Sequence, residues 1–409
     1  MTSSRFSTAG LARLSARRPW ATLGFWLLLL VFAAIAAPSL GNSLTTETKF
    51  ISKPESQKGQ DLLEQRLRGP KPVTETIIVR SETATVDDAA FKQQIDKVTS
   101  ELAGMPQIVA SYTTYYQADN AELVSADRHS TLISVTMVGK LDEATDNVPD
   151  YEAALNRASQ DSSFKVMTVG DASMNHELTT ISEKDLGKGE QMGLPIALII
   201  LVIVFGALVA AGLPIMLGLV SVFVAIGLAA IVGRTMDLSF FIVNMIGMIG
   251  LAVGIDYALF VIERYREERR RGHSKHEAIE IAGGTASKAV LFSGGTVILA
   301  LSGMLIVPES TFKSLGLGAV LVVIVAIAAT LMLIPALLSL LGDKIDWPRR
   351  KKYDAATAAK QAAHDNEVIH GGFWGRMAKL VMTHPVISLT LAVSLLIACA
   401  LPYFDINKG

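Results

Sequence analysis

FFIVNMIGMIGLAVGIDYALFVI, residues Phe240–Ile262, is an apolar stretch with one charged residue, Asp256. Crossing the hydrocarbon core of a bilayer, about 30 Å thick, takes roughly 20 consecutive and mostly apolar residues of helix. The stretch therefore predicts a membrane-spanning helix. Six further apolar runs have a suitable length: Trp20–Leu40, Met192–Val209, Gly212–Val232, Ala289–Val307, Leu315–Leu341 and Pro385–Phe404. The chain is predicted to be an α-helical polytopic membrane protein with seven transmembrane helices.

The composition agrees with a membrane protein. Charged residues make up 18% of the 409 residues, against about a quarter in ordinary soluble proteins. The single cysteine, Cys399, lies in the seventh run, so an intramolecular disulfide and a cysteine-based metal site are both excluded. The sequence contains no evident nucleophile–base pair, phosphate loop or metal-ligand cluster. We expect a protein that is not an enzyme, uses no cofactor or metal and binds no nucleic acid.

Two features of the apolar runs bear on their boundaries. The second and third runs are separated only by Ala210–Ala211, which predicts a tight hairpin with its hinge there. The first run has an Arg-rich start and small residues at Ala36 and Ala37, as signal peptides do. Its length of about 20 residues favours a spanning helix instead.

Basic residues determine the predicted orientation. They cluster before the first run, after the fourth and between the sixth and seventh. Threading seven spans through the chain places all three clusters on one side, which the positive-inside rule assigns to the cytoplasm. The predicted parts, for a protein of the inner (plasma) membrane, are a cytoplasmic N-terminus (1–19), a first span (20–40), an external domain (41–190), a five-span bundle (191–341), a cytoplasmic linker (342–384) and a seventh span (385–404).

The external segment alternates predicted strands and helices. Their order is β-α-β-β-α-β, the split βαβ pattern of ferredoxin-like domains. An α+β ferredoxin-like domain with a binding or gating role is therefore predicted. The predicted elements are Thr76–Arg80, Asp87–Ala103, Ile108–Tyr116, Thr131–Val138, Asp150–Gln160 and Lys165–Gly170.

Asp256 is the residue of the fourth span that demands an explanation. A carboxyl group within the hydrocarbon costs several kcal/mol, so such residues face a protein interior or a water path and usually serve a function. A helical step of about 100° per residue places Ile249 and Phe260 on the same face as Asp256. Asp256 is either a protonation switch or a structural aspartate capped by a hydroxyl group, such as that of Ser293 or Thr296.

Small residues recur on the same span. Gly247, Gly250 and Gly254 follow one another at spacings of three and four, and such a stripe lets a neighbouring helix approach closely. We therefore predict that one face of this helix packs tightly while another presents the acid.

Three segments resemble a known family. GIDYALFVIERYREE (Gly254–Glu268), VLFSGGTVILALSGM (Val290–Met304) and LIPALLSLLG (Leu333–Gly342) are similar to the fourth, fifth and sixth spans of the MmpL family (mycobacterial membrane protein, large), within the resistance-nodulation-division superfamily. The layout of one span, an external porter-type domain, five spans, a linker and a seventh span is similar as well. The resemblance implies a proton relay through Asp256, Tyr257 and Ser293, with Phe260 and Ile249 lining the cavity beside it.

The function implied by this resemblance is export of lipids or other hydrophobic molecules, driven by the proton-motive force. Members of the family usually repeat the plan, with a second Asp-Tyr pair and a second porter domain. We therefore expect the N-terminal half of a transporter, whose partners are membrane lipids, a hydrophobic substrate and either a missing C-terminal half or a second copy. The alternatives are a SecD/SecF-like protein-translocation auxiliary and a non-transporting lipid- or sterol-sensing module.

Overall fold

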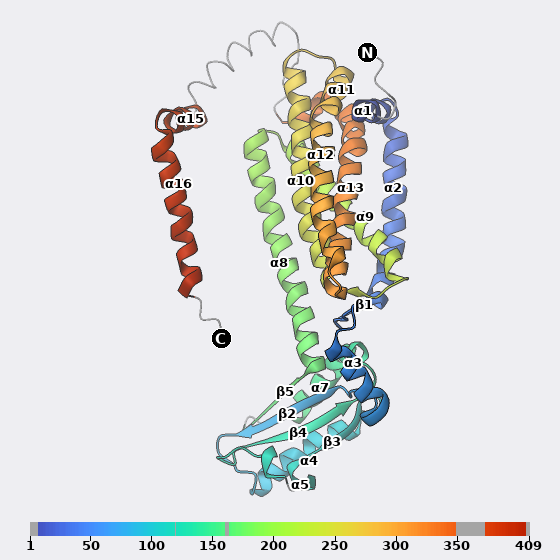
Figure 1. The fold of residues 1–409 in the computed structure, drawn as a ribbon, viewed down its shortest axis with the longest axis vertical. Helices are drawn as coiled ribbons and strands as arrows, with labels where there is room; N and C mark the ends of the chain where they lie inside the picture. The colour runs from blue at the N-terminus through green and yellow to red at the C-terminus, as the bar shows by residue number, and fades with distance from the viewer. Residues whose placement is uncertain (1–6, 119, 160–162, 349–372, 406–409) are drawn as a thin grey trace.

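A computed structural model describes residues 7–118, 120–159, 163–348 and 373–405. It consists of a bundle of long helices and a small α/β domain at one end of that bundle (Figure 1). Within the described residues, seven helices are long and apolar enough to cross a membrane, and each predicted span overlaps one of them. The helices that contain them are α2 (Pro19–Ala36), α8 (Asp171–Phe205), α9 (Leu208–Gly233), α10 (Phe241–Arg270), α12 (Ala286–Ser302), α13 (Ser310–Leu341) and α16 (Pro385–Ala400).

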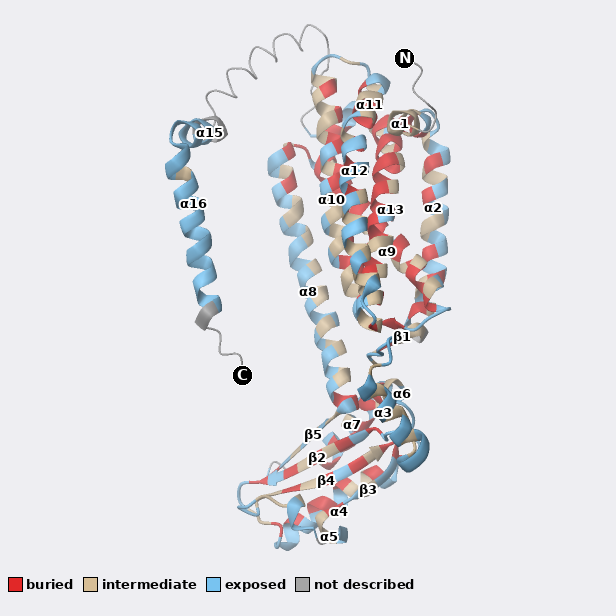
Figure 2. Ribbon diagram, in the orientation of Figure 1, coloured by how far each residue is buried: buried red, intermediate tan, exposed pale blue. Residues whose placement is uncertain are grey.

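The centre of the bundle is formed by α9, α10 and α13. Half or nearly half of the apolar window is buried in α9 and α10, and two thirds in α13, whereas α8 and α12 are each 11% buried. Helix α16 has no buried residue and stands apart from the other helices (Figures 1 and 2). The long sides of α8 and α12 are therefore available to lipid or to further protein.

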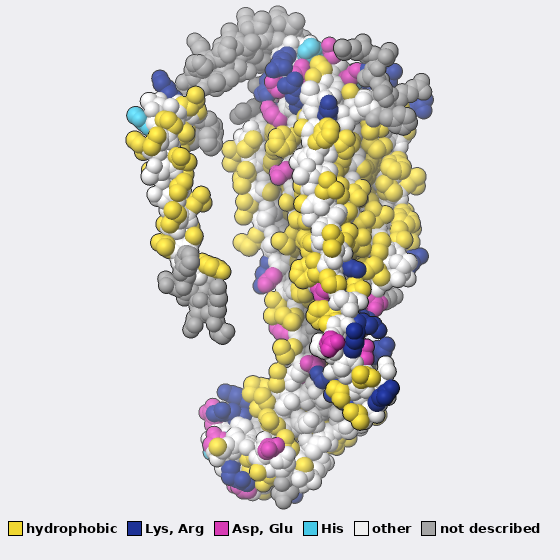
Figure 3. Space-filling model, viewed as in Figure 1, with side chains coloured by type: hydrophobic (Ala, Val, Ile, Leu, Met, Phe, Trp, Pro, Cys, Tyr) yellow, Lys and Arg dark blue, Asp and Glu magenta, His cyan; other side chains and the backbone are white. Residues whose placement is uncertain are grey.

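Two short helices close one end of the bundle. Helices α1 (Thr8–Arg17) and α11 (Lys275–Gly284) begin at the capping hydroxyls of Ser7 and Ser274. They are joined by an ion pair between Arg13 and Glu280, and the Ser339 hydroxyl of α13 donates to the Ala16 carbonyl at 2.7 Å. This is also the end at which basic and acidic side chains gather, while apolar side chains cover the middle of the bundle (Figure 3).

The hinge between the second and third spans differs from the prediction. Helix α8 ends at Phe205 and α9 begins at Leu208, so the break lies at Gly206 and Ala207. Gly206 has φ +63°, a left-handed conformation that glycine adopts without the steric cost of a Cβ. The predicted hinge residues Ala210 and Ala211 are instead helical and fully buried in α9.

The small domain contains a four-stranded sheet in the order β3-β4-β2-β5, with all neighbours antiparallel. Along β2 and β4, buried side chains alternate with partly or fully exposed ones, and the buried ones pack against two helices. The elements are β2 (Thr74–Ser81), α4 (Ala89–Ala103), β3 (Val109–Thr113), β4 (Ser130–Met137), α7 (Val148–Ala158) and β5 (Phe164–Gly170).

Several short elements of this domain were not predicted. The predicted strand over Ile108–Tyr116 is shorter, because the chain turns into α5 (Tyr115–Ala118), where the Tyr116 hydroxyl donates to the Val86 carbonyl at 2.6 Å. The other additions are α3 (Glu55–Leu63) and α6 (Leu141–Asp146).

Sheet and membrane helix meet without a linker. Helix α8 starts directly after β5, so the predicted boundary at residues 190 and 191 falls inside a continuous helix. Glu75 of β2 is 1% exposed and accepts hydrogen bonds from the backbone N–H groups of Ala172 (2.9 Å) and Ser173 (3.1 Å). A carboxylate satisfies the free N–H groups and the positive dipole of a helix N-terminus. The sheet therefore holds the first turn of α8.

A second connection joins the domain to the short loops at the end of the bundle that faces it (Figure 1). Strand β1 (Leu44–Thr45) pairs in parallel with β6 (Leu238–Ser239), just before α10. Phe50 bridges to Glu309, just before α13. The domain is thus held both by α8 and by this strap across the loops. Most of the predicted linker, residues 349–372, lies outside the described part of the chain; α15 (Phe373–Thr383) precedes α16.

Candidate functional site

Asp256 lies on the outward face of α10. It is exposed, together with Met248, Ala252 and Phe260, which follow at spacings of four residues. The opposite face of the helix, including Gly250, is buried in the bundle. The acid therefore does not point into the core formed by the described helices.

The three glycines of α10 differ in how closely they approach the neighbouring helices. A Cβ at Gly254 would lie 2.6 Å from the Cα of Gly218 on α9, which means that the two backbones touch. A Cβ at Gly250 would lie 2.6 Å from side chains of Val222 and Val322. At Gly247 the nearest atom, a carboxylate oxygen of Glu190 on α8, would be 3.6 Å away. The close contacts therefore involve α9 and α13, and Gly247 lies at a looser contact with α8.

Tyr257 points in a different direction from Asp256. It is 7% exposed, and its hydroxyl lies 3.2 Å from the position a Cβ at Gly294 of α12 would take. Ser293 of α12 is close enough to interact with this hydroxyl, although among the described residues no partner meets hydrogen-bond geometry. Ser293 itself is exposed. The structure thus brings Tyr257 and Ser293 together at the α10–α12 contact, with Asp256 beside them on the outer face.

The hypothesis of a capped structural aspartate finds no bond to support it. Asp256 has no hydrogen bond or ion pair within the described ranges. The Thr296 hydroxyl donates instead to the Phe292 carbonyl of its own helix at 3.1 Å. The acid is therefore available to water, lipid or a partner helix.

Two further buried hydroxyls lie toward the Arg-rich end of the bundle, and the sequence reasoning missed them. Ser287 of α12 and Thr330 of α13 are fully buried, and neither has a hydrogen-bond partner among the described residues. Ser287 precedes Gly294 by two helical turns on α12, and Thr330 follows Ile327 by about one turn on α13; Gly294 and Ile327 both lie close to Tyr257. Each is a single hydroxyl residue near or within an apolar run, which the sequence shows. Whether such a hydroxyl is buried depends on how the helices pack, which the sequence does not show.

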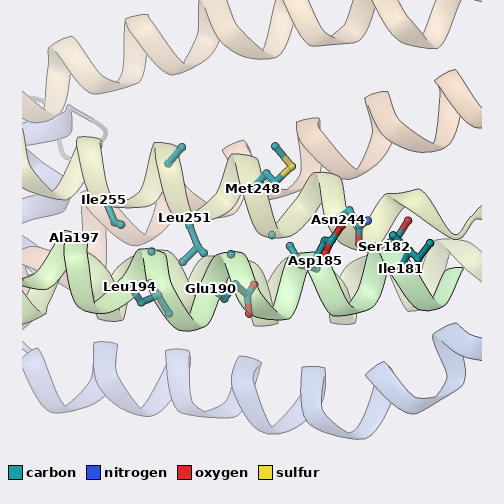
Figure 4. A pocket seen from close by; sticks show the side chains of 15 residues that line it. Ile181, Ser182, Asp185, Glu190, Leu194, Ala197, Asn244, Met248, Leu251 and Ile255 are labelled. Atoms are coloured by element: carbon teal, nitrogen blue, oxygen red, sulfur yellow. The ribbon is translucent and has the colours of Figure 1, made fainter. Parts of the chain in front are cut away.

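A cavity of about 650 Å³ separates the middle of α8 from α10 (Figure 4). Its walls are mainly apolar, and Ile255, at its inner end, directly precedes Asp256. The predicted cavity residues Ile249 and Phe260 do not line it: Ile249 packs against the bundle core, and Phe260 is 62% exposed beyond the inner end. Space next to Asp256 therefore exists, but it is bounded by α8 and not by those two side chains.

Side chains at the Arg-rich end of α10 join α10 to α8, the helix on the other side of the cavity. Arg266 pairs with Asp346 at 2.8 Å and donates to the carbonyl of Phe205, the last residue of α8, at 2.9 Å. Glu268 is 2% exposed and pairs with Arg264 and Arg271. Helices α8 and α10 are thus joined at this end and apart toward the sheet domain.

The sequence model of the MMPL family matches residues 50–388, a range that includes the sheet domain, α8–α13 and the Asp256–Tyr257 pair. The chain belongs to the MMPL family.

Two of three similar proteins carry exporter names. The chain is 29% identical over 392 residues to the mycolic acid-containing lipids exporter MmpL11 of Mycolicibacterium smegmatis, covering 95% of this chain and 40% of that protein. It is 29% identical over 408 residues to the putative membrane protein SCO6666 of Streptomyces coelicolor (98% and 54%). It is 27% identical over 343 residues to the trehalose monomycolate exporter MmpL3 of Mycobacterium tuberculosis (80% and 36%). The chain therefore spans about half the length of these relatives or less.

Proposed function

We propose that this MMPL chain forms part of an exporter of lipids or other hydrophobic molecules that is driven by the proton-motive force. The observation that carries the proposal is the placement of Asp256: an exposed carboxyl group on the outward face of α10, without a hydrogen bond or ion pair among the described residues, and next to Ile255, which lines the cavity. A carboxyl group that is neutral in one conformation and charged in another can couple proton movement to helix movement. Moving one charge through 100 mV supplies about 2.3 kcal/mol. Tyr257 and Ser293 complete the relay at the α10–α12 contact.

The small domain has the role of an external porter domain in this proposal. Its strand order, with β2 and β4 in the middle and β5 and β3 at the edges, supports the proposal that it is ferredoxin-like. Its rigid attachment to α8 through Glu75 provides a route by which movement of a membrane helix reaches the domain.

Orientation in the inner membrane follows from charge. The basic clusters before α2 and after α10 lie at the end of the bundle remote from the sheet domain (Figure 3), which the positive-inside rule assigns to the cytoplasm. A single cysteine introduced as Glu122→Cys, in a Cys399→Ser background, should react with a membrane-impermeant maleimide in intact cells. Labelling that requires permeabilised cells would reverse the orientation.

The open face of Asp256 indicates a further partner. We infer that a second set of membrane helices, from the remainder of a longer transporter or from a second copy, packs against this face. Relatives of about twice the length support this inference.

The test is substitution of Asp256 in the complete transporter. Asp256→Asn keeps the size of the side chain and removes the titration, so proton-coupled export should fall at least tenfold while expression and membrane insertion stay normal. Glu183→Gln, an exposed carboxyl change on α8 away from the pair, is the matched control. Export is measured as the appearance of labelled lipid at the outer face of the membrane, and proton flux with a pH-sensitive dye in proteoliposomes. Near-normal export by Asp256→Asn would exclude the relay.

A further inference from the structure

Four polar groups along one seam of the bundle are buried and have no hydrogen-bond partner among the residues that the structure describes. They are the hydroxyls of Tyr257, Ser287 and Thr330 and the Nε–H of Arg264. Buried polar groups in proteins are almost always satisfied, either by protein atoms or by ordered water. Four unsatisfied groups on three neighbouring helices therefore call for one common explanation.

Two of the helices, α10 and α12, run in opposite directions along the seam (Figure 1). The buried face of α12 consists of Ser287, Val290 and Gly294, and Gly294 meets the Tyr257 hydroxyl of α10. Seven residues are close to two full helical turns, or about 10 Å. Seven residues from that contact toward the Arg-rich end, α12 presents Ser287 and α10 presents Arg264. Periodicity thus brings these two side chains to the same level and onto facing sides.

The third helix places a hydroxyl between these two levels. Ile327 of α13 packs against Gly294, and Thr330 follows it by three residues, about 4.5 Å nearer to the Arg-rich end. Hydrogen-bonded oxygen atoms lie about 2.8 Å apart, so one or two water molecules can bridge each step. A buried water typically makes about three hydrogen bonds to groups that are otherwise unsatisfied. The four groups therefore have the spacing of a column of water molecules.

The column ends in a balanced network of ion pairs. Arg264 pairs with Glu267 at 2.6 Å and with Glu268 at 2.7 Å. Arg271, which is half-exposed, pairs with the same two carboxylates at 2.5 Å and 2.8 Å. The two carboxylates compensate the charge of the two guanidinium groups, so Arg264 does not present an unbalanced positive charge to a proton. The network also extends from the buried seam to the surface of the bundle.

We propose that ordered water fills the seam from Tyr257 to Arg264, and that protons leave the Asp256–Tyr257 pair through it toward the Arg-rich end. Thr330 and Ser287 are positioning residues, whose hydroxyls hold the water molecules in line. Each water accepts one proton and passes another on, so the column regains its starting state and the proton is released at the Arg-rich end. The proton path rests on the proposed export function, whereas the water column does not.

Two hydroxyls can be removed with little change in volume. Thr330→Val replaces the hydroxyl by a methyl group, and Thr330→Ser retains it as the conservative variant. Ser287→Ala removes the second hydroxyl. Its matched control is Ser221→Ala on α9, because Ser221 is equally buried but donates to the Leu217 carbonyl of its own helix at 2.8 Å.

The water column is measured by radiolytic hydroxyl-radical footprinting of the purified 409-residue chain, which oxidises side chains next to bound water. Tyr257 should be oxidised although it is buried, whereas Tyr151, fully buried in the sheet domain, should not. Thr330→Val and Ser287→Ala should slow oxidation of Tyr257 about tenfold, the factor that corresponds to one lost hydrogen bond of about 1.4 kcal/mol. Thr330→Ser and Ser221→Ala should match the original chain. Equal oxidation of Tyr257 in all variants, or none in the original chain, would overturn the column.

The proton path is tested in the complete transporter in proteoliposomes, with a pH-sensitive dye. Thr330→Val and Ser287→Ala should lower proton flux about tenfold, and Thr330→Ser and Ser221→Ala should leave it unchanged. Undiminished flux in Thr330→Val, with Asp256→Asn inactive, would overturn this path and leave the export function standing. Near-normal export by Asp256→Asn would instead remove the proposed function and this path with it, and oxidation of Tyr257 would still support or overturn the water column.

Discussion

Substitution of the glycines of α10 by alanine gives a graded test of how this helix packs. Gly254→Ala places a methyl group 2.6 Å from the Gly218 Cα. Ordinary contact begins at 3.4 Å, so α9 and α10 must separate locally by 3.4 − 2.6 = 0.8 Å. Overpacking of this kind costs about 1–3 kcal/mol. Because the obstacle is a backbone atom, which cannot rotate away, we expect a value near 3 kcal/mol.

The same substitution at the other two glycines should have smaller effects. At Gly250 the obstacles are valine side chains at 2.6 Å, which can shift in part, so we expect about 1–2 kcal/mol. At Gly247 both neighbours lie at 3.6 Å or more, within ordinary contact. There the better helix propensity of alanine, up to about 1 kcal/mol, should leave stability unchanged or slightly raised.

The assay is thermal unfolding of the purified chain in detergent, followed by tryptophan fluorescence. An unfolding entropy of about 2.1 cal/mol/K per residue gives roughly 1 °C per kcal/mol for a chain of 409 residues, so Gly254→Ala should lower the Tm by about 3–4 °C. Gly250→Ala should lower it by less, and Gly247→Ala should not lower it. A Tm for Gly254→Ala equal to or above that of Gly247→Ala would refute the close backbone contact between α9 and α10.

Three other predictions concern buried or capping polar groups. Glu75→Ala should weaken the start of α8 by about 2 kcal/mol, as for loss of a charged hydrogen-bond acceptor, and amide hydrogen exchange over residues 171–175 should accelerate; unchanged exchange would contradict the capping role. Thr330→Val removes a buried unpaired hydroxyl, so the Tm should rise by a few degrees; if the hydroxyl carries water toward Tyr257, proton flux should fall at the same time, and undiminished flux would exclude that path. Burial alone would raise the pKa of Glu309, but hydrogen bonds from Thr311 and Phe312 outweigh it and lower the pKa below its usual range; the stabilisation is therefore present at neutral pH and lost as the pH falls below about 4.5. Glu309→Gln should reduce the free energy of unfolding at pH 7 by about 0.5–2 kcal/mol, which a lower Tm reports. The difference in Tm from the original chain should shrink toward pH 3.

The sequence predicted the membrane helices well because the bilayer imposes a local rule. Every residue of a span such as Phe240–Ile262 meets the same apolar surroundings, so length and composition suffice to locate it. Alternating burial likewise marks β2 and β4 in the sheet domain. Ends and hinges were predicted less well. The break at Gly206 depends on a left-handed backbone conformation. From the sequence alone, the nearby alanines Ala210 and Ala211 could equally have been the hinge.

Asp256 could be singled out from the sequence because one carboxyl group in an apolar run is visible without any structure. Its direction and its neighbours could not. Helical periodicity places residues on a common face but does not say which face another helix covers. The bundle covers the side of Gly250 and Gly254, and leaves Asp256, Phe260 and Met248 open.

The sequence by itself thus determined how many helices can span the membrane, where the acid lies along the chain and the family to which the chain is similar. These depend on composition and on short motifs, which are properties of contiguous residues. Tertiary structure alone decided that Tyr257 meets α12 while Asp256 faces outward, that Glu75 caps α8 across the sheet, and that Glu190 lines a cavity between α8 and α10. Each of these depends on residues far apart in the chain, whose contacts arise only when the helices pack.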